Sequence, residues 1–146
     1  MSKNRRIKSV KTELVKKARE AMLAAVQLYN NPQVTFKAES FITLAVIGWT
    51  YLLHAYYRNN GIDYRYYRYV GKKKVYDKTK YGAYKHWELE RCLNDTDCPL
   101  DNDTITNLRF LIGYVLVGTG FQVLFHSPPG VLFTFPSQYY TLSVTG

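Results

Sequence analysis

The stretch FITLAVIGWTYLLHAYY, residues 41–57, decides the fold of this chain, and His54 is its only strongly polar side chain. Crossing a bilayer takes about 20 apolar residues, whereas stretches of about 10 to 14 are typical of core helices. We therefore expect a helix over residues 37–58 that other helices cover, capped by Thr35 and carrying Glu39 in its first turn. Glycine inside a helix costs about 1 kcal/mol against alanine. Gly48 therefore predicts a point where a neighbouring helix passes closely.

The segment before this stretch has the pattern of an amphipathic helix. Its apolar residues recur at helical spacing, while its charged residues fall mostly on other faces. We expect this helix to start at Thr12 and Glu13, after a frayed arm over residues 1–10, and to end before Pro32. Its apolar positions are Leu14, Ala18, Met22, Ala25 and Tyr29. A helix with one apolar face needs a partner, which residues 41–57 supply.

The composition favours one basic domain in a reducing compartment. The chain has 146 residues, a usual size for a single domain, with 20 Lys and Arg against 11 Asp and Glu. The resulting charge of +9 favours polyanionic partners such as RNA or anionic membrane surfaces. Cys92 and Cys98 form no metal-ligand spacing, and the basic N-terminus lacks the apolar run of a secretory signal. We expect a cytoplasmic protein.

The charge is distributed unevenly along the chain. Every Lys, Arg, Asp and Glu lies in the first 109 residues, and the 37 residues from Phe110 to Gly146 contain none. We expect a helix in ITNLRFLIG, residues 105–113, capped by Asp103 or Thr104. Beyond Gly118 we expect short strands or irregular structure, because proline, glycine and β-prone residues are frequent there. The predicted domains are therefore residues 1–113, with an insertion at about 59–85, and an uncharged tail at 114–146.

The insertion is both basic and rich in tyrosine. From Arg58 to Lys85 there are nine Lys or Arg against two Asp, interleaved with seven tyrosines. Such a segment is typical of a nucleic-acid surface, where cations neutralise phosphates and rings stack on bases. The alternative is a solvated two-stranded insertion, with strands at 64–70 and 73–76 around Gly71. The candidate nucleic-acid-binding residues are Arg65, Tyr66, Tyr67, Arg68, Lys72, Lys73, Lys74, Lys78 and Lys80.

No other residue makes a strong catalytic or metal-binding pattern. His54 is interpreted as a hydrogen-bonded interior histidine, because no partner lies at metal-ligand spacing. Glu88 and Glu90 fall in a short helix predicted at residues 86–93, where residues i and i+2 do not converge, so they are assigned to its solvated face. Cys92 is interpreted as a small buried hydrophobe. We expect no catalytic residue, no metal ligand and no cofactor.

Three pieces of the chain resemble a bacterial family that looks like part of the HEPN superfamily of helical nucleotide-associated domains. They are residues 11–55, from KTELVKKARE to YLLHA, then HWELERCL, and then ITNLRFLIG. The resemblance implies an all-helical up-and-down bundle that often dimerises. In active members it implies a metal-independent endoribonuclease of defence or toxin systems. Its chemistry uses an arginine and a histidine on one helix, four to six residues apart.

This chain departs from that pattern where the pair is expected. YVLVGTG follows the LIG of the predicted last helix, Arg109 precedes the expected position, and His126 lies seventeen residues further on. No catalytic residue is carried over. From His126 onward the tail resembles peptides produced when reading frames run through ribosomal RNA loci, which fits a frame change or a chimeric gene near Gly113. The alternative is a lineage-specific ending that forms a strand pair or a membrane hairpin.

The sequence therefore predicts an all-α, up-and-down helical bundle with a small β-hairpin-like insertion and an irregular or β-prone C-terminal tail. The leading hypothesis is a HEPN-like, RNA-associated domain of a defence or toxin-type system, truncated and without ribonuclease activity, with a homodimer as a further expectation. One alternative is a small membrane protein with short spans at residues 41–57 and 110–125, disfavoured because both are too short. Another is a noncatalytic interaction module.

Overall fold

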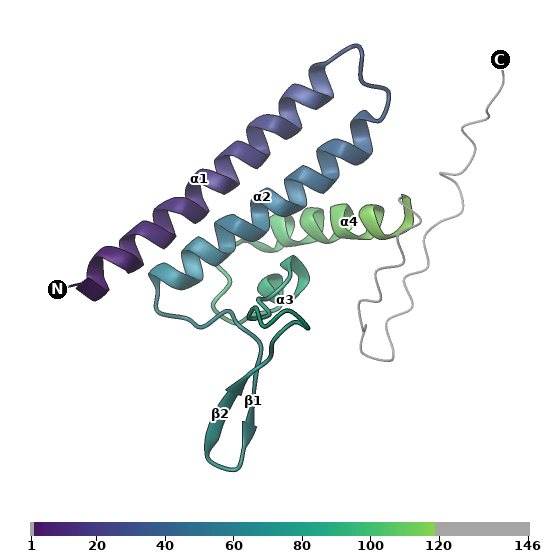
Figure 1. Cartoon of the computed structure of the whole chain (residues 1–146). Coiled ribbons are helices and arrows are strands. Elements are labelled where there is room, and N and C mark those ends of the chain that lie inside the picture. Colours follow the sequence, from purple (N-terminus) through teal and green to yellow (C-terminus); the bar gives the residue numbers. More distant parts are fainter. Residues whose placement is uncertain (1, 119–146) are drawn as a thin grey trace.

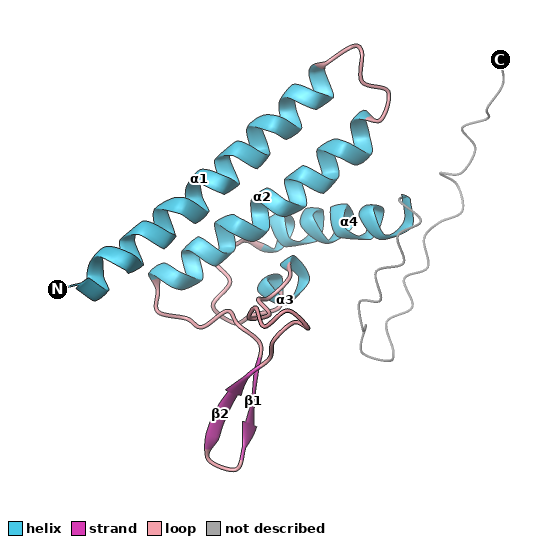
Figure 2. Cartoon of the chain, viewed as in Figure 1, coloured by secondary structure: helices cyan, strands magenta, loops and turns pink. Residues whose placement is uncertain are grey.

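The computed structural model describes residues 2–118 and is mostly helical with one two-stranded antiparallel sheet. Two long helices, α1 (Ser2–Asn30) and α2 (Lys37–Asn59), lie side by side in opposite directions (Figure 1). The hairpin of β1 (Tyr67–Val70) and β2 (Lys73–Tyr76) projects away from the helices (Figure 2). The expectation of a helical domain with a β-hairpin insertion is confirmed. The predicted strands and irregular structure of the tail at 119–146 lie outside the described residues.

Helix α2 follows residues 41–57 as expected, with Glu39 in its first turn. The predicted cap was wrong, because Phe36 occupies the N-cap position and makes no side-chain hydrogen bond there. The predicted frayed arm was also wrong, since α1 starts at Ser2 and Thr12 lies inside it. Lysine and arginine are good helix formers, and extending an existing helix adds a hydrogen bond per residue without a new nucleus.

Small residues let α1 approach α2 closely. Ala18 and Ala25 of α1 are buried. A Cβ placed on Gly48 of α2 would lie 3.0 Å from Cγ and Sδ of Met22, and 3.3 Å from the carbonyl oxygen of Ala18. The prediction that a neighbouring helix passes closely at Gly48 is confirmed, and this contact accounts for a glycine in the middle of a helix.

The main core lies between α2, α3 (Leu89–Leu93) and α4 (Asn102–Gly118). The Tyr57 hydroxyl donates to the carbonyl oxygen of Cys92 at 2.6 Å, which ties α2 to α3. Burying an aromatic ring while its hydroxyl finds a partner satisfies both parts of tyrosine. The buried cluster consists of Leu53, Tyr57, Tyr64, Trp87, Leu89, Cys92, Leu93 and Leu108. It includes two residues that flank the hairpin, so the insertion is anchored in the core.

Helix α3 is shorter than predicted. The sequence predicts a helix over residues 86–93, but Glu88 is extended and α3 starts at Leu89. The reason is a pairing with the segment before the hairpin, because the Trp87 amide donates to the carbonyl oxygen of Tyr64 at 2.8 Å, and Arg65 pairs with His86. Residues 86 and 87 therefore pair with the segment before the hairpin instead of forming the first turn of α3, and this pairing closes the insertion.

Helix α4 differs from its prediction at both ends. Asp101 caps it instead of Asp103 or Thr104, accepting a hydrogen bond of 2.7 Å from the Thr104 amide. The helix then continues to Gly118, five residues beyond Gly113, so the predicted boundary at 113 falls within a helix. Leu108 is buried, and Ile105, Leu111 and Ile112 pack against the core.

A membrane-spanning helix would need both sufficient length and sufficient apolarity. Within residues 2–118, no helix meets both requirements.

Candidate nucleic-acid interface

The hairpin is a regular antiparallel ribbon with a tight turn. Tyr67 pairs with Tyr76, and Tyr69 pairs with Lys74. Gly71, with a φ of 62°, starts the two-residue turn. Glycine with positive φ at this position is the pattern of a type II′ hairpin turn, whose twist matches that of the flanking strands. Because side chains alternate along a strand, Tyr67 and Tyr69 lie on one face and Arg68 on the other.

Asp63 organises the part of the insertion next to the helices. Its carboxylate accepts hydrogen bonds from Arg65 Nε at 2.9 Å and Nη2 at 3.1 Å, from Lys74 Nζ at 3.0 Å, and from the Tyr76 hydroxyl at 2.8 Å. Burial acts to raise the pKa of Asp63, but these donors outweigh it and hold the pKa well below its usual range. We call Asp63, Arg65, Lys74 and Tyr76 the hairpin base.

Aromatic rings reinforce the hairpin base. The guanidinium of Arg65 lies 4.1 Å from the ring centroid of Tyr76, and the ammonium of Lys74 lies 3.8 Å from that of Tyr67. Tyr76 also packs edge-on against Tyr84, with centroids 5.7 Å apart. A cation over a ring is attracted by the ring quadrupole. Two of the predicted nucleic-acid-binding cations, Arg65 and Lys74, are therefore engaged inside the protein.

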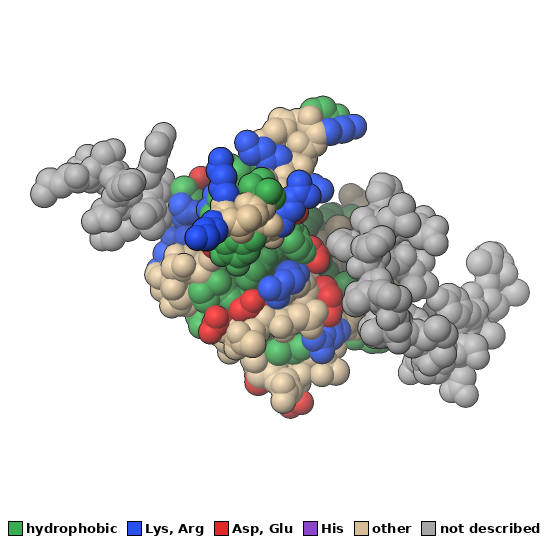
Figure 3. Space-filling view, turned by 90° about the horizontal axis from the view of Figure 1, so that it is seen from below, with side chains coloured by type: hydrophobic (Ala, Val, Ile, Leu, Met, Phe, Trp, Pro, Cys, Tyr) green, Lys and Arg blue, Asp and Glu red, His purple; other side chains and the backbone are tan. Residues whose placement is uncertain are grey.

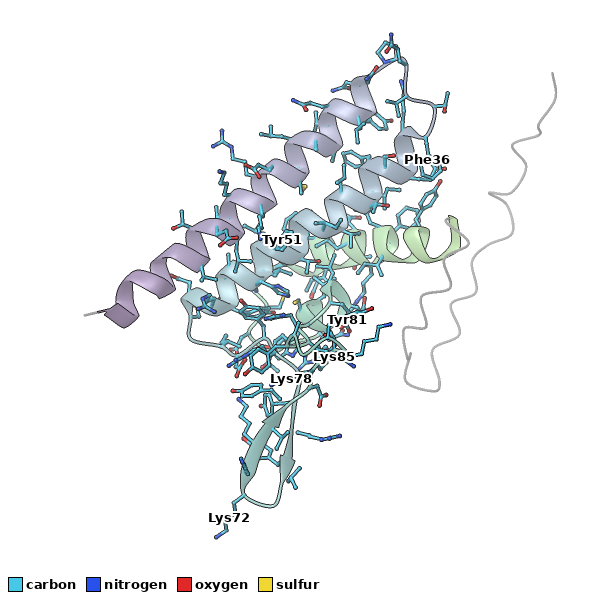
Figure 4. The ribbon with its side chains drawn as sticks, viewed as in Figure 1. Phe36, Tyr51, Lys72, Lys78, Tyr81 and Lys85 are labelled. Atoms are coloured by element: carbon cyan, nitrogen blue, oxygen red, sulfur yellow. The ribbon has the colours of Figure 1, made fainter. Side chains whose placement is uncertain are left out.

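The far end of the hairpin has a different character. Tyr69 is 66% exposed and Val70 59% exposed, and neighbouring cations also face solvent. Lys72 lies at the end of the hairpin and points away from the helices (Figure 4). Within residues 2–118, no hydrogen bond, ion pair or ring contact engages the cationic groups of Arg68, Lys72 and Lys73. We call the five residues Arg68, Tyr69, Val70, Lys72 and Lys73 the hairpin tip.

The remaining candidates belong neither to the hairpin base nor to the hairpin tip. Tyr67 is 41% exposed, while the Tyr66 hydroxyl donates to Glu88, so Tyr66 serves the fold. Lys78 and Lys80 are exposed, with their ammonium groups 5.2 Å and 5.0 Å from the ring centroids of Tyr84 and Tyr81. The sequence predicted one continuous surface. The structure instead divides the candidates into an exposed set, consisting of Tyr67, Arg68, Lys72, Lys73, Lys78 and Lys80, and a set with internal contacts, consisting of Arg65, Tyr66 and Lys74.

A pocket of about 570 Å³ lies beside the hairpin base, and sequence reasoning missed it. Arg58 reaches it from the end of α2, and His86 reaches it from the segment that closes the insertion. These two residues are 28 positions apart, so no spacing rule could have joined them. Burial, followed by the positive charge of Arg65, lowers the pKa of His86. The pocket is lined by Arg58, Gly61, Ile62, Asp63, Tyr64, Arg65, Tyr84 and His86.

The other chemically notable residues serve the fold. His54 is 7% exposed, and its Nε2–H donates to the carbonyl oxygen of Trp87 at 2.7 Å, which confirms an interior histidine. Burial lowers its pKa. Cys92 is fully buried, and burial raises the pKa of its thiol to about 12, so it is the predicted small hydrophobe rather than a nucleophile.

Glu88, which precedes α3, and Glu90, which lies in it, are not fully exposed to solvent. Glu88 accepts from Tyr66 in a partly buried contact, so the solvated face was wrong for Glu88, whereas the Glu90 side chain is 42% exposed and accepts from Arg109 at 3.2 Å. Each links its segment to another part of the chain. Within residues 2–118, no group of three or more His, Cys, Asp and Glu is placed to hold a metal ion.

Comparisons with known proteins place the chain in a family without naming an activity. No curated protein and no solved structure matches it. One family model, described as Domain of unknown function (DUF3644), matches residues 13–114. This match covers all four helices at least in part, the hairpin and the pocket. The chain therefore belongs to the DUF3644 family.

Proposed function

We propose that this chain is a HEPN-like, RNA-associated domain of a defence or toxin-type system, which binds RNA through the hairpin tip and does not cleave it. The observation that carries the proposal is the exposure of three cations at the end of a hairpin that projects from the helices, where the exposed ring of Tyr69 lies on the face opposite Arg68 and Lys73. Figure 3 shows Lys and Arg side chains beside hydrophobic ones on the face seen from below, with several Asp and Glu side chains among them. A flexible single strand can use both kinds of contact.

Two physical terms favour RNA over other polyanions. Each cation that neutralises a phosphate releases counterions, and each base that stacks on an aromatic side chain adds about 1 to 3 kcal/mol. Arg68, Lys72 and Lys73 supply the first term, and Tyr69 supplies the second. An acidic protein surface could use the cations but would gain less from the ring, so stacking distinguishes RNA from an acidic peptide.

The absence of cleavage is part of the proposal. Arg109, the arginine nearest the position expected for a catalytic pair, donates to Glu90 at 3.2 Å and also to Asn94. It is therefore occupied in joining α4 to α3. His126 lies outside the described residues. A purified protein that cleaved RNA, and lost cleavage on His126→Ala, would contradict this part of the proposal.

The decisive experiment measures binding of a short single-stranded RNA against salt concentration by fluorescence anisotropy. Removing two phosphate contacts with Arg68→Gln and Lys72→Gln should lower the magnitude of the log–log salt slope by about 1.4. The matched control, Lys16→Gln with Arg19→Gln on α1, removes one lysine and one arginine from an exposed helix surface. Equal effects of the two double variants, or binding that ignores salt, would favour a noncatalytic interaction module whose charge serves solubility.

We propose that the functional protein is a homodimer. Each copy is an all-α, up-and-down bundle that the hairpin interrupts. The antiparallel α1 and α2 support the bundle. Exposed apolar side chains support the dimer, because Val15, Leu52 and Tyr56 are 43%, 42% and 37% exposed beside an apolar groove of about 300 Å³. Leu52→Glu should lower the mass measured by light scattering from dimer to monomer. A wild-type monomer across the concentration range would contradict the dimer.

We place this protein in the cytoplasm, since its two cysteines, Cys92 and Cys98, are both free. Fractionation of expressing cells tests this placement. Recovery of the chain with membranes after an alkaline wash would overturn it and favour the membrane alternative.

A further inference from the structure

Arg58, at the end of α2, is the one arginine of the pocket that lacks a counter-ion. Its Nε is buried and, alone among buried side-chain nitrogens and oxygens within the described residues, makes no hydrogen bond. No acidic group lies within ion-pair distance of it among residues 2–118. A buried donor without a partner costs about 1 to 3 kcal/mol, so native proteins seldom leave one unused. Nε itself is shielded from solvent, but the Arg58 side chain lines the pocket, so its positive charge acts on a ligand there.

The single acid of the pocket cannot serve as that partner. Asp63 already accepts from Arg65, Lys74 and Tyr76. Arg65 in turn uses two of its five N–H donors on Asp63 and keeps the others available. With one carboxylate against Arg58, Arg65 and Lys74, this corner of the molecule holds more positive than negative charge. It is therefore suited to an anion.

His86 and Tyr84 also line the pocket. His86 lines the pocket with more than a third of its surface exposed, and its ring lies 5.3 Å from that of Tyr64, which in turn stacks on His54 at 4.4 Å. A packed imidazole can donate to an anion without the freedom of a lysine side chain. Tyr84 supplies a phenol and a ring whose centroid lies 5.3 Å from the guanidinium of Arg65.

We propose that this pocket binds a phosphate monoester, held by Arg58, Arg65 and His86. Guanidinium groups match the oxygen geometry of phosphate and bind it through paired hydrogen bonds. A phosphate monoester carries close to two negative charges at neutral pH, whereas each backbone phosphate of a nucleic acid carries one. The volume of about 570 Å³ lies within the range of small-ligand sites, which leaves room for an attached nucleoside beside Tyr84.

The source we assign to this phosphate is the end of an RNA strand whose body lies on the hairpin tip. That assignment rests on the proposed function, because it requires RNA to bind at the tip, on the same hairpin whose base residues Asp63 and Arg65 line the pocket. The phosphate site itself does not depend on it. A free mononucleotide offers the same monoester, and the experiment is arranged to tell the two sources apart.

The test compares three probes on the full chain: a short RNA with a 5′-phosphate, the same RNA with a 5′-hydroxyl, and uridine monophosphate. We expect the phosphorylated RNA to bind about tenfold more tightly than the hydroxyl form, in line with the strength of charge-assisted hydrogen bonds. Arg58→Gln should abolish this preference, and Arg58→Lys should retain only part of it. The matched control Lys85→Gln removes a neighbouring exposed cation outside the pocket and should keep the full preference.

Each outcome decides something. Equal binding of the two RNAs by the wild type, together with no binding of uridine monophosphate, would overturn the phosphate site while leaving RNA binding at the tip intact. Binding of uridine monophosphate with no binding of either RNA would support the site, reassign its source to a free nucleotide and overturn the proposed function. Equal losses in Arg58→Gln and Lys85→Gln would show a general charge effect and overturn the site. Should Arg58→Gln fail to fold in a circular dichroism melt, His86→Gln takes its place.

Discussion

The hairpin base and the hairpin tip are built from the same residue types but differ in what their cations do. At the base, Arg65 and Lys74 both contact Asp63, and their charges also lie over tyrosine rings. At the tip, Arg68, Lys72 and Lys73 face solvent. The difference is one well-placed carboxylate. Asp63 converts a basic, tyrosine-rich segment into a support, and the same composition without an acid becomes a surface available to a polyanion.

The largest expected effect comes from removing the acid of the base. Asp63→Asn should lower the free energy of unfolding by about 2 kcal/mol, because charge-assisted hydrogen bonds are lost and two partly buried cations lose their counter-ion. Urea denaturation followed by circular dichroism measures the change. Asp77→Asn is the matched control, since it removes an acid from the same insertion that makes no side-chain ion pair. Equal losses in the two variants would show that the base has no special role.

The next effect tests a second tie between the insertion and the helices. Tyr66→Phe removes the hydroxyl that donates to Glu88 and should cost about 1 kcal/mol of unfolding free energy. Tyr69→Phe removes the same atom from the tip, where no hydrogen bond to the hydroxyl is found within the described residues, and should leave stability unchanged. Thermal melts of the two variants side by side measure the contrast. A larger loss of stability in Tyr69→Phe than in Tyr66→Phe would contradict the assignment of a supporting role to the base and not to the tip.

The buried histidine behind the base gives a pH dependence. The pKa of His54 lies below its ordinary value because of burial, so the unfolded chain binds more protons between those two pKa values. Its contribution to stability is present above the ordinary pKa of about 6.5 and is lost as the pH falls toward the folded pKa. Denaturant midpoints between about pH 7 and pH 5 should fall less steeply in His54→Gln than in the wild type. Equal slopes of the denaturant midpoint against pH in His54→Gln and in the wild type would contradict this role of His54.

The smallest expected effect belongs to the tip itself. Lys73→Gln should change the free energy of unfolding by less than about 0.5 kcal/mol, as is usual for an exposed side chain without partners. The same denaturation assay measures it. A loss comparable to that of Asp63→Asn would show that the tip also supports the fold, and would remove the basis for treating its cations as a binding surface.

Sequence patterns were reliable where a local rule acts alone. The apolar run at residues 41–57 predicts α2 nearly to the residue, Gly48 predicts the close approach of α1, and β2 falls where its pattern places it. The helix starts were predicted less well. Thr12 and Thr35 look like caps, yet α1 begins earlier and Phe36 precedes α2. Residues with good helix propensity extend a helix past a polar residue that would otherwise cap it.

The candidate site was only half predictable. Interleaved tyrosine and cations identified the right segment, and the exposed tip lies within it. The division into base and tip was not predictable, because it depends on which cations the chain brings to Asp63. Arg58 and His86 carried no signal as a pair, since they meet through the packing of residues 86 and 87 against the segment before the hairpin.

By itself, the sequence determined a helical domain with a central apolar helix, a basic tyrosine-rich hairpin and an uncharged end, because periodicity and composition act over a few neighbouring residues. Tertiary structure decided which charges are neutralised and which remain available, because electrostatic pairing depends on distance in space. The lysines and arginines at the base, in the pocket and at the tip are the same residue types, and they differ in their surroundings. Those surroundings exist only once the insertion is closed against the helices.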